Sequence, residues 1–244
     1  MTHLFFIFFL GIFGTIVGSF LNVVILRMNT GKGLGGRSQC LSCNHILSWY
    51  ELIPVISFLV QQGKCRSCRS KISIQYPLVE LVTGILFATT GFFITSGWYL
   101  FIWLLLIALG MIIAVYDMRH RMIPITLLLW FAVIGAFLGF HISGILVALP
   151  FFLLWIISSG KWIGFGDIEM MAIIGVILGP ISGFSVIMIS FWIASAVMIP
   201  VVYLMKKGNA QQNPEIPFGP FLLLGTYLVG VCGLDVLKII MKMI

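Results

Sequence analysis

Long apolar runs alternate with short polar segments along this chain, and the runs have the length of membrane helices. The first run extends from Leu4 to Leu26, and a helix needs about 20 apolar residues to cross a bilayer. No basic segment precedes it and no small-residue cleavage site closes it, which favours a membrane helix over a cleaved signal peptide. The runs predict eight transmembrane helices, at residues 4–26, 77–95, 98–116, 122–140, 142–158, 166–180, 183–205 and 218–240.

This arrangement predicts an all-α polytopic membrane protein with one sizeable segment outside the bilayer. We expect three parts: a first transmembrane helix at 1–26, a cytoplasmic domain at 27–76 and a seven-helix membrane domain at 77–244. The composition agrees, because 61% of the 244 residues are hydrophobic and only 9% are charged. A soluble domain carries about a quarter charged residues.

The basic residues set the expected orientation in the membrane. The formal net charge is +7, but the lysines and arginines lie between apolar runs, where they act as topology signals and form no nucleic-acid-binding surface. With the N-terminus outside, every lysine and arginine except Lys238 and Lys242 falls on the cytoplasmic side. This distribution predicts that residues 27–76 are cytoplasmic.

Four of the five cysteines lie in this cytoplasmic segment, in two Cys-x-x-Cys pairs. Two such pairs, here 21 residues apart, are typical of a four-thiolate zinc site. Disulfides are less favoured because the cytosol is reducing. An ion closed by four protein ligands is structural, and it would supply folding energy to this small domain. The expected ligands are Cys40, Cys43, Cys65 and Cys68, with His45 an ordinary loop residue.

Acidic residues are scarce, and two of them are expected at one edge of the membrane. Asp117 ends the third predicted helix and Asp167 begins the sixth, both at the cytoplasmic face. Two aspartates held close together cannot both ionise, so one pKa rises. The charged member then deprotonates a water while the neutral member hydrogen-bonds the scissile carbonyl. Asp117 and Asp167 are therefore candidates for an aspartic protease dyad.

Structural interpretations of the same acidic residues stay open at this point. Asp117, which two arginines follow, fits an ordinary charged loop, and Asp167 fits a helix N-cap, a position that aspartate favours. Glu51 fits a helix cap or an ion pair. Glu80, near a helix N-terminus, fits the helix dipole equally well as a binding site.

Two other classes of protein are compatible with parts of the pattern. A proton-coupled membrane transporter also carries carboxylates in its helices, but its sites lie near the bilayer midplane, whereas both aspartates are expected at the edge. A non-enzymatic assembly factor built on the zinc domain would tolerate Asp117→Asn, and a protease would not.

Several short motifs follow one another in a fixed order along most of the chain. They are Gly18-Ser19-Phe20-Leu21-Asn22-Val23-Val24, the four cysteines, Glu51-Leu52-Ile53-Pro54, Gly63-Lys64-Cys65-Arg66, Tyr76-Pro77-Leu78-Val79-Glu80, Asp117 followed by Ile123-Pro124, Gly164-Phe165-Gly166-Asp167, and Pro217-Phe218-Gly219-Pro220. This ordered set resembles the bacterial prepilin peptidases, the leader peptidases of type IV pili, type II secretion and competence pseudopili. Their GxGD motif is shared with presenilin-type proteases.

The resemblance implies an inner-membrane aspartic endopeptidase. Such an enzyme cuts prepilin or pseudopilin precursors after the glycine that ends a short, basic, cytosolic leader. By the same resemblance Asp117 and Asp167 are the catalytic residues. The motif residues that support them are Gly164, Gly166, Pro124, Pro217 and Gly219.

The resemblance also implies a second activity. Many members N-methylate the new N-terminal residue with S-adenosylmethionine, and the cytoplasmic loop is linked to that activity. Glu51, Gly63 and Lys64 are the candidate methyltransferase residues, and a peptidase that has lost methylation is the alternative. The chain departs from the usual pattern at Ile125, where the family has Asp or Asn, and at Glu169, where it has lysine.

Overall fold

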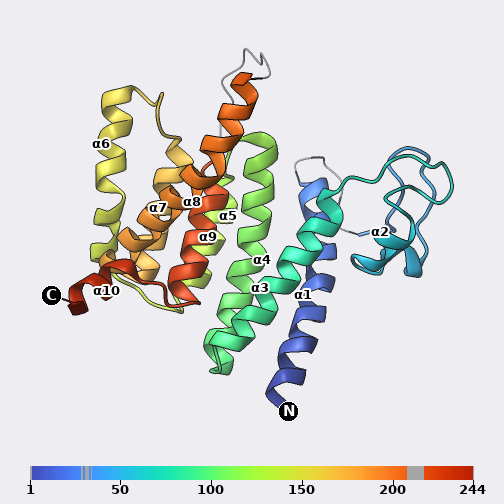
Figure 1. Cartoon of the computed structure of the whole chain (residues 1–244), viewed down its shortest axis with the longest axis horizontal. Coiled ribbons are helices and arrows are strands. Elements are labelled where there is room, and N and C mark those ends of the chain that lie inside the picture. The colour runs from blue at the N-terminus through green and yellow to red at the C-terminus, as the bar shows by residue number, and fades with distance from the viewer. Residues whose placement is uncertain (1, 29, 31–32, 34, 208–216, 244) are drawn as a thin grey trace. The chain divides into compact units, whose positions relative to one another are not determined.

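The computed structural model describes residues 2–28, 30, 33, 35–207 and 217–243 (Figure 1); Lys32 and Glu215 lie outside these residues. Within them the secondary structure is helical, and the only extended pairings are isolated bridges, which confirms the all-α prediction. The elements are α1 (Thr2–Arg27), η1 (Trp49–Leu52), α2 (Ile56–Val60), α3 (Gln75–Phe93), α4 (Gly97–His120), α5 (Ile125–Gly135), η2 (Ile142–Val147), α6 (Leu149–Ser158), α7 (Phe165–Leu178), α8 (Pro180–Lys207), α9 (Gly219–Gly230) and α10 (Val236–Met243).

Four helices, α1, α3, α4 and α8, are long and apolar enough to cross a membrane. They coincide with four of the predicted spans. The other predicted spans contain shorter helices, the longest of which is α7 with 14 residues. Such a helix is about 21 Å long at 1.5 Å per residue, short of the roughly 30 Å of a hydrocarbon core. The structure therefore supports a membrane protein with four candidate spans, and eight full-length spans are not confirmed.

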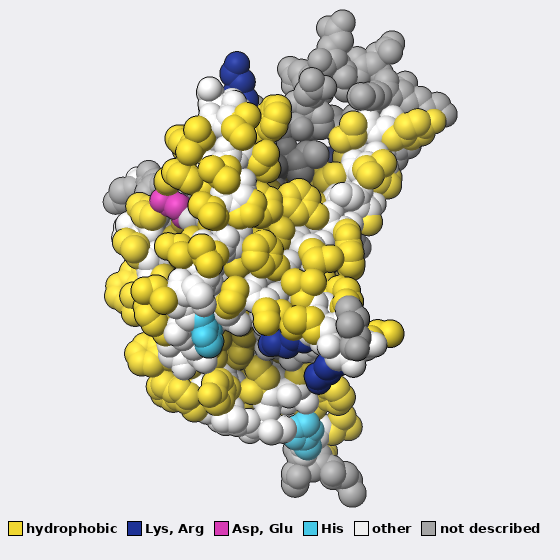
Figure 2. Space-filling model, turned by 90° about the vertical axis from the view of Figure 1, so that its left-hand side faces the viewer, with side chains coloured by type: hydrophobic (Ala, Val, Ile, Leu, Met, Phe, Trp, Pro, Cys, Tyr) yellow, Lys and Arg dark blue, Asp and Glu magenta, His cyan; other side chains and the backbone are white. Residues whose placement is uncertain are grey.

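The shorter helices nevertheless expose apolar side chains. On α6, Leu153 is 51% exposed and Ile157 is 72% exposed. Figure 2 shows the side of the molecule at the left of Figure 1, where hydrophobic side chains cover most of the surface and charged ones are few. Contiguous apolar surface of this extent marks a site of contact with lipid or protein.

The predicted span at 218–240 consists of two helices, α9 and α10, joined by a turn. Gly233 in the turn has φ of +71°, a left-handed conformation that glycine adopts without strain. Asp235 then precedes α10 and accepts the Lys238 N–H at 3.3 Å, as an N-cap residue does. The apolar pattern runs through this turn, so the sequence predicted one continuous helix.

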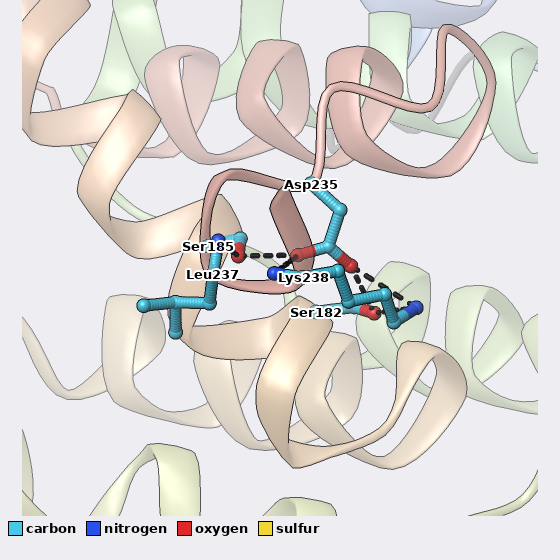
Figure 3. A network of polar contacts seen from close by, with 5 residues as sticks. All are labelled: Ser182, Ser185, Asp235, Leu237 and Lys238. Atoms are coloured by element: carbon cyan, nitrogen blue, oxygen red, sulfur yellow. Dashed lines mark hydrogen bonds and ion pairs between the residues drawn. The ribbon is translucent and has the colours of Figure 1, made fainter. Parts of the chain in front are cut away.

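Asp235 also fastens α10 to α8. Its carboxylate accepts hydrogen bonds from Ser182 at 2.7 Å and Ser185 at 2.6 Å, and it pairs with Lys238 Nζ at 3.1 Å (Figure 3). This network explains why Asp235 is buried, and it agrees with the sequence analysis, which did not propose Asp235 as a catalytic residue.

The chain folds into two compact units, Met1–Ile112 and Ile113–Ile244, with the boundary inside α4. In the first unit α1 packs along α3. A Cβ on Gly18 of α1 would lie 2.8 Å from the Glu80 Cα of α3, so the backbones approach as closely as only small residues permit.

In the second unit η2 packs against α7. A Cβ on Gly144 would overlap the carbonyl of Gly175, and the His141 N–H donates to the Val176 carbonyl at 2.8 Å. These backbone contacts hold η2 against the C-terminal half of α7.

Candidate active site

Asp117 lies in the last turn of α4 and is only 5% exposed. Its Oδ2 accepts a hydrogen bond from the N–H of Gly219, the first residue of α9, at 3.2 Å. A helix N-terminus favours negative charge. A Cβ on residue 219 would lie 2.6 Å from this Oδ2, so glycine is what lets α9 come so close. Asp117 is thus a buried, helix-directed carboxylate, and the interpretation as a solvated loop residue is wrong.

Asp167 lies in the first turn of α7, where the GxGD motif forms the helix start. The N-cap position belongs to Gly164, whose backbone is extended at φ −69° and ψ 140°. The Asp167 N–H donates to the Gly164 carbonyl at 3.2 Å. A Cβ on Gly164 would lie 3.2 Å from Asp167 Oδ2, so this glycine leaves room for the carboxylate. Asp167 is therefore not the N-cap, as one interpretation of the sequence had it.

The two aspartates share one neighbourhood, since the charge of Asp117 acts on Asp167. The side chain of Ile123, in the segment between α4 and α5, lies between their supporting glycines. A Cβ on Gly219 would lie 3.4 Å from Ile123 Cδ1, and one on Gly166 would lie 3.2 Å from Ile123 Cβ. The Asp117–Gly219 pair and the Gly166–Asp167 turn therefore pack against one isoleucine.

The prolines of the motifs stand at helix starts. Pro124 is the N-cap of α5 with φ −65°, and Pro217 precedes the start of α9 by two residues. The two positions at which the chain departs from the family pattern lie close in sequence to these motifs. Ile125 is the first residue of α5 and is 50% exposed, and Glu169 lies half-buried in α7.

A cavity of about 660 Å³ adjoins Asp167. One end carries an aromatic cluster, in which Phe191 stacks on Phe151 at 6.0 Å and lies 4.8 Å from Phe218 between ring centroids. Ala194, Met198 and Val202 of α8 continue the wall. Because the lining is mainly apolar with a carboxylate at its edge, the cavity suits an extended apolar peptide.

The four predicted zinc ligands meet in the first unit. The sulfur atoms of Cys40, Cys43, Cys65 and Cys68 all lie within 4.8 Å of one another, and Cys40 and Cys68 Sγ are 3.8 Å apart. Four sulfurs at about 2.3 Å from a tetrahedral zinc are separated by about 3.8 Å. Hydrogen bonds from the backbone of Ser42 and Cys43 lower the pKa of the Cys40 thiol to about 6, whereas burial and the neighbouring thiols raise that of Cys43 to about 12. The donor set thus fits Zn²⁺, which binds thiolates.

The two cysteine pairs form the same small loop twice. Cys40 N–H donates to the His45 carbonyl at 2.9 Å, and Cys65 N–H donates to the Ser70 carbonyl at 2.8 Å. In each loop the residue after the second cysteine is left-handed, with φ 57° at Asn44 and 61° at Arg69. The sequence analysis did not detect this duplication, although Cys-x-Ser-Cys occurs in both pairs.

A second cavity, of about 550 Å³, lies beside Glu51 in the segment between α1 and α3. Glu51 is 7% exposed; its Oε2 accepts the Ser48 N–H at 2.9 Å and lies 3.6 Å from His45 Nε2. Its Oε1 is the one buried side-chain oxygen or nitrogen without a hydrogen-bond partner among the described residues. The helix-cap interpretation therefore explains one oxygen of Glu51 and leaves the other available to a ligand.

Positive charge lines the same cavity. Lys64, Arg66 and Arg69 all contribute to its wall, and the Arg66 guanidinium lies 5.4 Å from the centre of the Tyr50 ring. Gly63, next to Lys64, has φ of +66°. Two of the three candidate methyltransferase residues, Glu51 and Lys64, thus line one cavity, and Gly63 adjoins it in sequence only. The sequence did not predict the other residues of the cavity wall.

Comparison with known proteins covers both units. Residues 12–94 match the model described as Bacterial Peptidase A24 N-terminal domain, and residues 99–199 match the Type IV leader peptidase family. A prepilin leader peptidase/N-methyltransferase of Bacillus subtilis is 33% identical, over 95% of this chain and 96% of the relative. Proteins of the same name from Aeromonas hydrophila and Pseudomonas aeruginosa are each 29% identical. They cover 91% and 90% of this chain, and 89% and 88% of their own lengths.

No solved structure matches the chain significantly. The sequence relatives therefore provide the assignment. Their similarity extends over both units and nearly the whole length of the Bacillus subtilis relative. The chain belongs to the type IV leader peptidase family.

Proposed function

We propose that this protein is a membrane aspartic endopeptidase that removes the leader of prepilin-like precursors, and that it N-methylates the new N-terminus. The observation that carries the peptidase proposal is the convergence of Asp117 and Asp167 from two helices on Ile123. Relatives over the full length are named prepilin leader peptidase/N-methyltransferase. The precursor and the lipid bilayer are the proposed partners.

The proposed reaction uses the two carboxylates as a pair. One carboxylate takes a proton from a water molecule while the oxygen of that water bonds to the carbonyl carbon of the glycine before the cleaved bond. The other carboxyl group, which is protonated, donates a hydrogen bond to the carbonyl oxygen. Collapse of the tetrahedral intermediate breaks the C–N bond, and the proton passes to the leaving amine. The Gly219 N–H, at 3.2 Å from Asp117 Oδ2, fixes the orientation of that carboxylate. Proton positions belong to the pair and not to one residue.

The proposed topology has eight membrane segments, the N-terminus outside and residues 27–76 in the cytoplasm of a bacterial inner membrane. It divides the chain into a first helix at 1–26, the zinc-binding domain at 27–76 and the protease domain at 77–244. The lysine and arginine distribution supports this orientation. It puts the scissile bond, at the end of a cytosolic leader, on the same face as Asp117 and Asp167.

The peptidase proposal is tested by cleavage of a prepilin co-expressed in membranes. Asp117→Asn and Asp167→Asn should each lower cleavage by at least about 10³-fold, because an amide can neither take the water's proton nor share one. Asp235→Asn is the matched control, since this buried aspartate of the same unit hydrogen-bonds only within its own network with α8 and α10. Near-normal cleavage by either dyad variant, in protein that is still inserted, removes that residue from the mechanism.

For methylation we propose that S-adenosylmethionine binds in the cavity beside Glu51. The fit rests on the donor set: a buried, unpartnered carboxylate oxygen suits the cationic part of the molecule, and Lys64 and Arg66 suit its carboxylate. When bound, it supplies an activated methyl group. Glu51 Oε1 is then the acceptor for the proton that the substrate amine loses.

The methylation proposal is tested with Glu51→Gln. We expect cleavage to continue and methylation to fall by about 100-fold, because the amide keeps the shape of Glu51 but accepts no proton. Mass spectrometry of the mature substrate's N-terminus reads the added methyl group. Wild-type protein that cleaves without methylating would identify a peptidase that has lost this activity.

A further inference from the structure

Val55 adopts a backbone conformation that side chains rarely allow. Its φ is 62° and its ψ is −50°, and the Ile56 N–H donates to the Pro54 carbonyl at 2.6 Å across it. This hydrogen bond closes a three-residue γ-turn of the strained hand. For a β-branched residue a positive φ is a genuine outlier, and such strain persists only where surrounding contacts impose it.

The contact that imposes it comes from the membrane helix α3. The Val55 N–H donates to Glu80 Oε2 at 2.7 Å, across 25 residues of sequence. Glu80 is 7% exposed, and the Ser19 side chain of α1 also hydrogen-bonds to it. A hydrogen bond to a charged acceptor is about twice as strong as a neutral one, so Glu80 holds this turn in place.

The turn lies in the wall of the cavity beside Glu51. Ile53 precedes the turn, Ile56 is its last residue and Ser57 follows it, and all three line that cavity. Because the turn reverses the chain between Glu51 and α2, its shape sets the distance between the Glu51 side and the α2 side of the cavity. Loss of the turn would move both walls.

We propose that Glu80 is a positioning residue for methyl transfer. It holds the Val55 γ-turn and so keeps the cavity shaped for the methyl donor, without itself touching the donor. The proposal rests on the proposed site for S-adenosylmethionine. A favourable interaction with the helix dipole alone does not explain Glu80, because its Oε2 accepts a hydrogen bond from Val55 in another segment.

The first experiment measures methyl transfer at varied S-adenosylmethionine concentration, with full-length protein in membranes and a leader-free substrate. Glu80→Leu should raise the KM for S-adenosylmethionine by about 10-fold or more, the effect of losing a hydrogen bond to a charged group, and change kcat much less. Glu80→Gln keeps an acceptor oxygen and should stay within about threefold of the wild-type KM. Cleavage of the intact precursor should be unchanged in both variants.

The second experiment tests the turn directly. Glycine adopts positive φ without strain, so Val55→Gly in the Glu80→Leu background should recover most of the KM. Leu59→Gly is the matched control, since Leu59 lies in α2, is 68% exposed and does not line the cavity. This second glycine should give no recovery. An unchanged KM in Glu80→Leu, or equal recovery by both glycines, would overturn the proposal.

The outcomes separate this inference from the proposed function beneath it. If Glu51→Gln methylates normally, the donor site is elsewhere and both proposals fail. If Glu51→Gln loses methylation while Glu80→Leu keeps its KM, only the positioning role fails. Loss of cleavage as well as methylation in Glu80→Leu would show a general defect of folding and would contradict a role confined to the donor cavity.

Discussion

At the scale of single residues, the candidate active site depends on glycines whose lack of a Cβ leaves room for neighbouring side chains. Gly219, Gly164 and Gly166 each face a dyad carboxylate or Ile123 at distances that a Cβ would shorten to between 2.6 and 3.4 Å. The tightest approach is Gly219 to Asp117 Oδ2. The glycines of the two motifs thus matter because they allow close packing of these side chains, and not only because their backbone is flexible.

Gly219→Ala should therefore impair cleavage by at least about 10-fold while the protein remains inserted. The added methyl group forces Asp117 Oδ2 away from its position, and overpacking of this kind costs about 1–3 kcal/mol. A gel assay of prepilin cleavage measures the effect. Gly233→Ala is a control for glycine loss, because no atom lies within 4 Å of its Cβ position, although its positive φ lowers stability. Cleavage by Gly219→Ala at the wild-type rate would contradict the steric argument.

At the scale of elements, the proposed zinc-binding domain is built on two loops that carry the same hydrogen bonds. Outside the short η1 and α2, its described residues contain no regular helix, and its pairings are the isolated bridges Gln39–Ile46 and Lys64–Lys71. Among its described residues, Cys65 is the one hydrophobic side chain that is buried. We therefore expect a bound metal to supply the folding free energy that an apolar core would otherwise provide.

Removal of the metal with a chelator should unfold this domain selectively. We expect proteolysis within residues 37–71 to become at least about 10-fold faster and methylation to be lost, because Glu51 and Lys64 lie between the cysteine pairs. The second unit holds both dyad aspartates, so cleavage of a prepilin should persist. Added Zn²⁺ should reverse both changes. Unchanged proteolysis in fully demetallated protein would contradict the structural role.

At the scale of the whole molecule, the sequence predicted the helical class and the cysteine cluster, and it singled out Asp117 and Asp167, because each leaves a local signal. Apolar runs, Cys-x-x-Cys spacing and a carboxylate beside an apolar run need no knowledge of contacts. The Gly219–Asp117 and Val55–Glu80 hydrogen bonds join residues 102 and 25 positions apart, and no local pattern announces them. The end of α9 and the start of α10 were missed for a similar reason. The turn at Gly233 and Asp235 interrupts the helix, but apolar residues continue on both sides of it.

The link between Asp117 and α9 has a consequence for biosynthesis. Asp117 is synthesised 102 residues before the amide that hydrogen-bonds it, and α5, α6, α7 and α8 are synthesised in the interval. The carboxylate therefore has its partner only after α9 has been delivered. A chain that is still incomplete on the ribosome therefore lacks the hydrogen bond that orients Asp117, and we expect cleavage activity only after α9 has been synthesised.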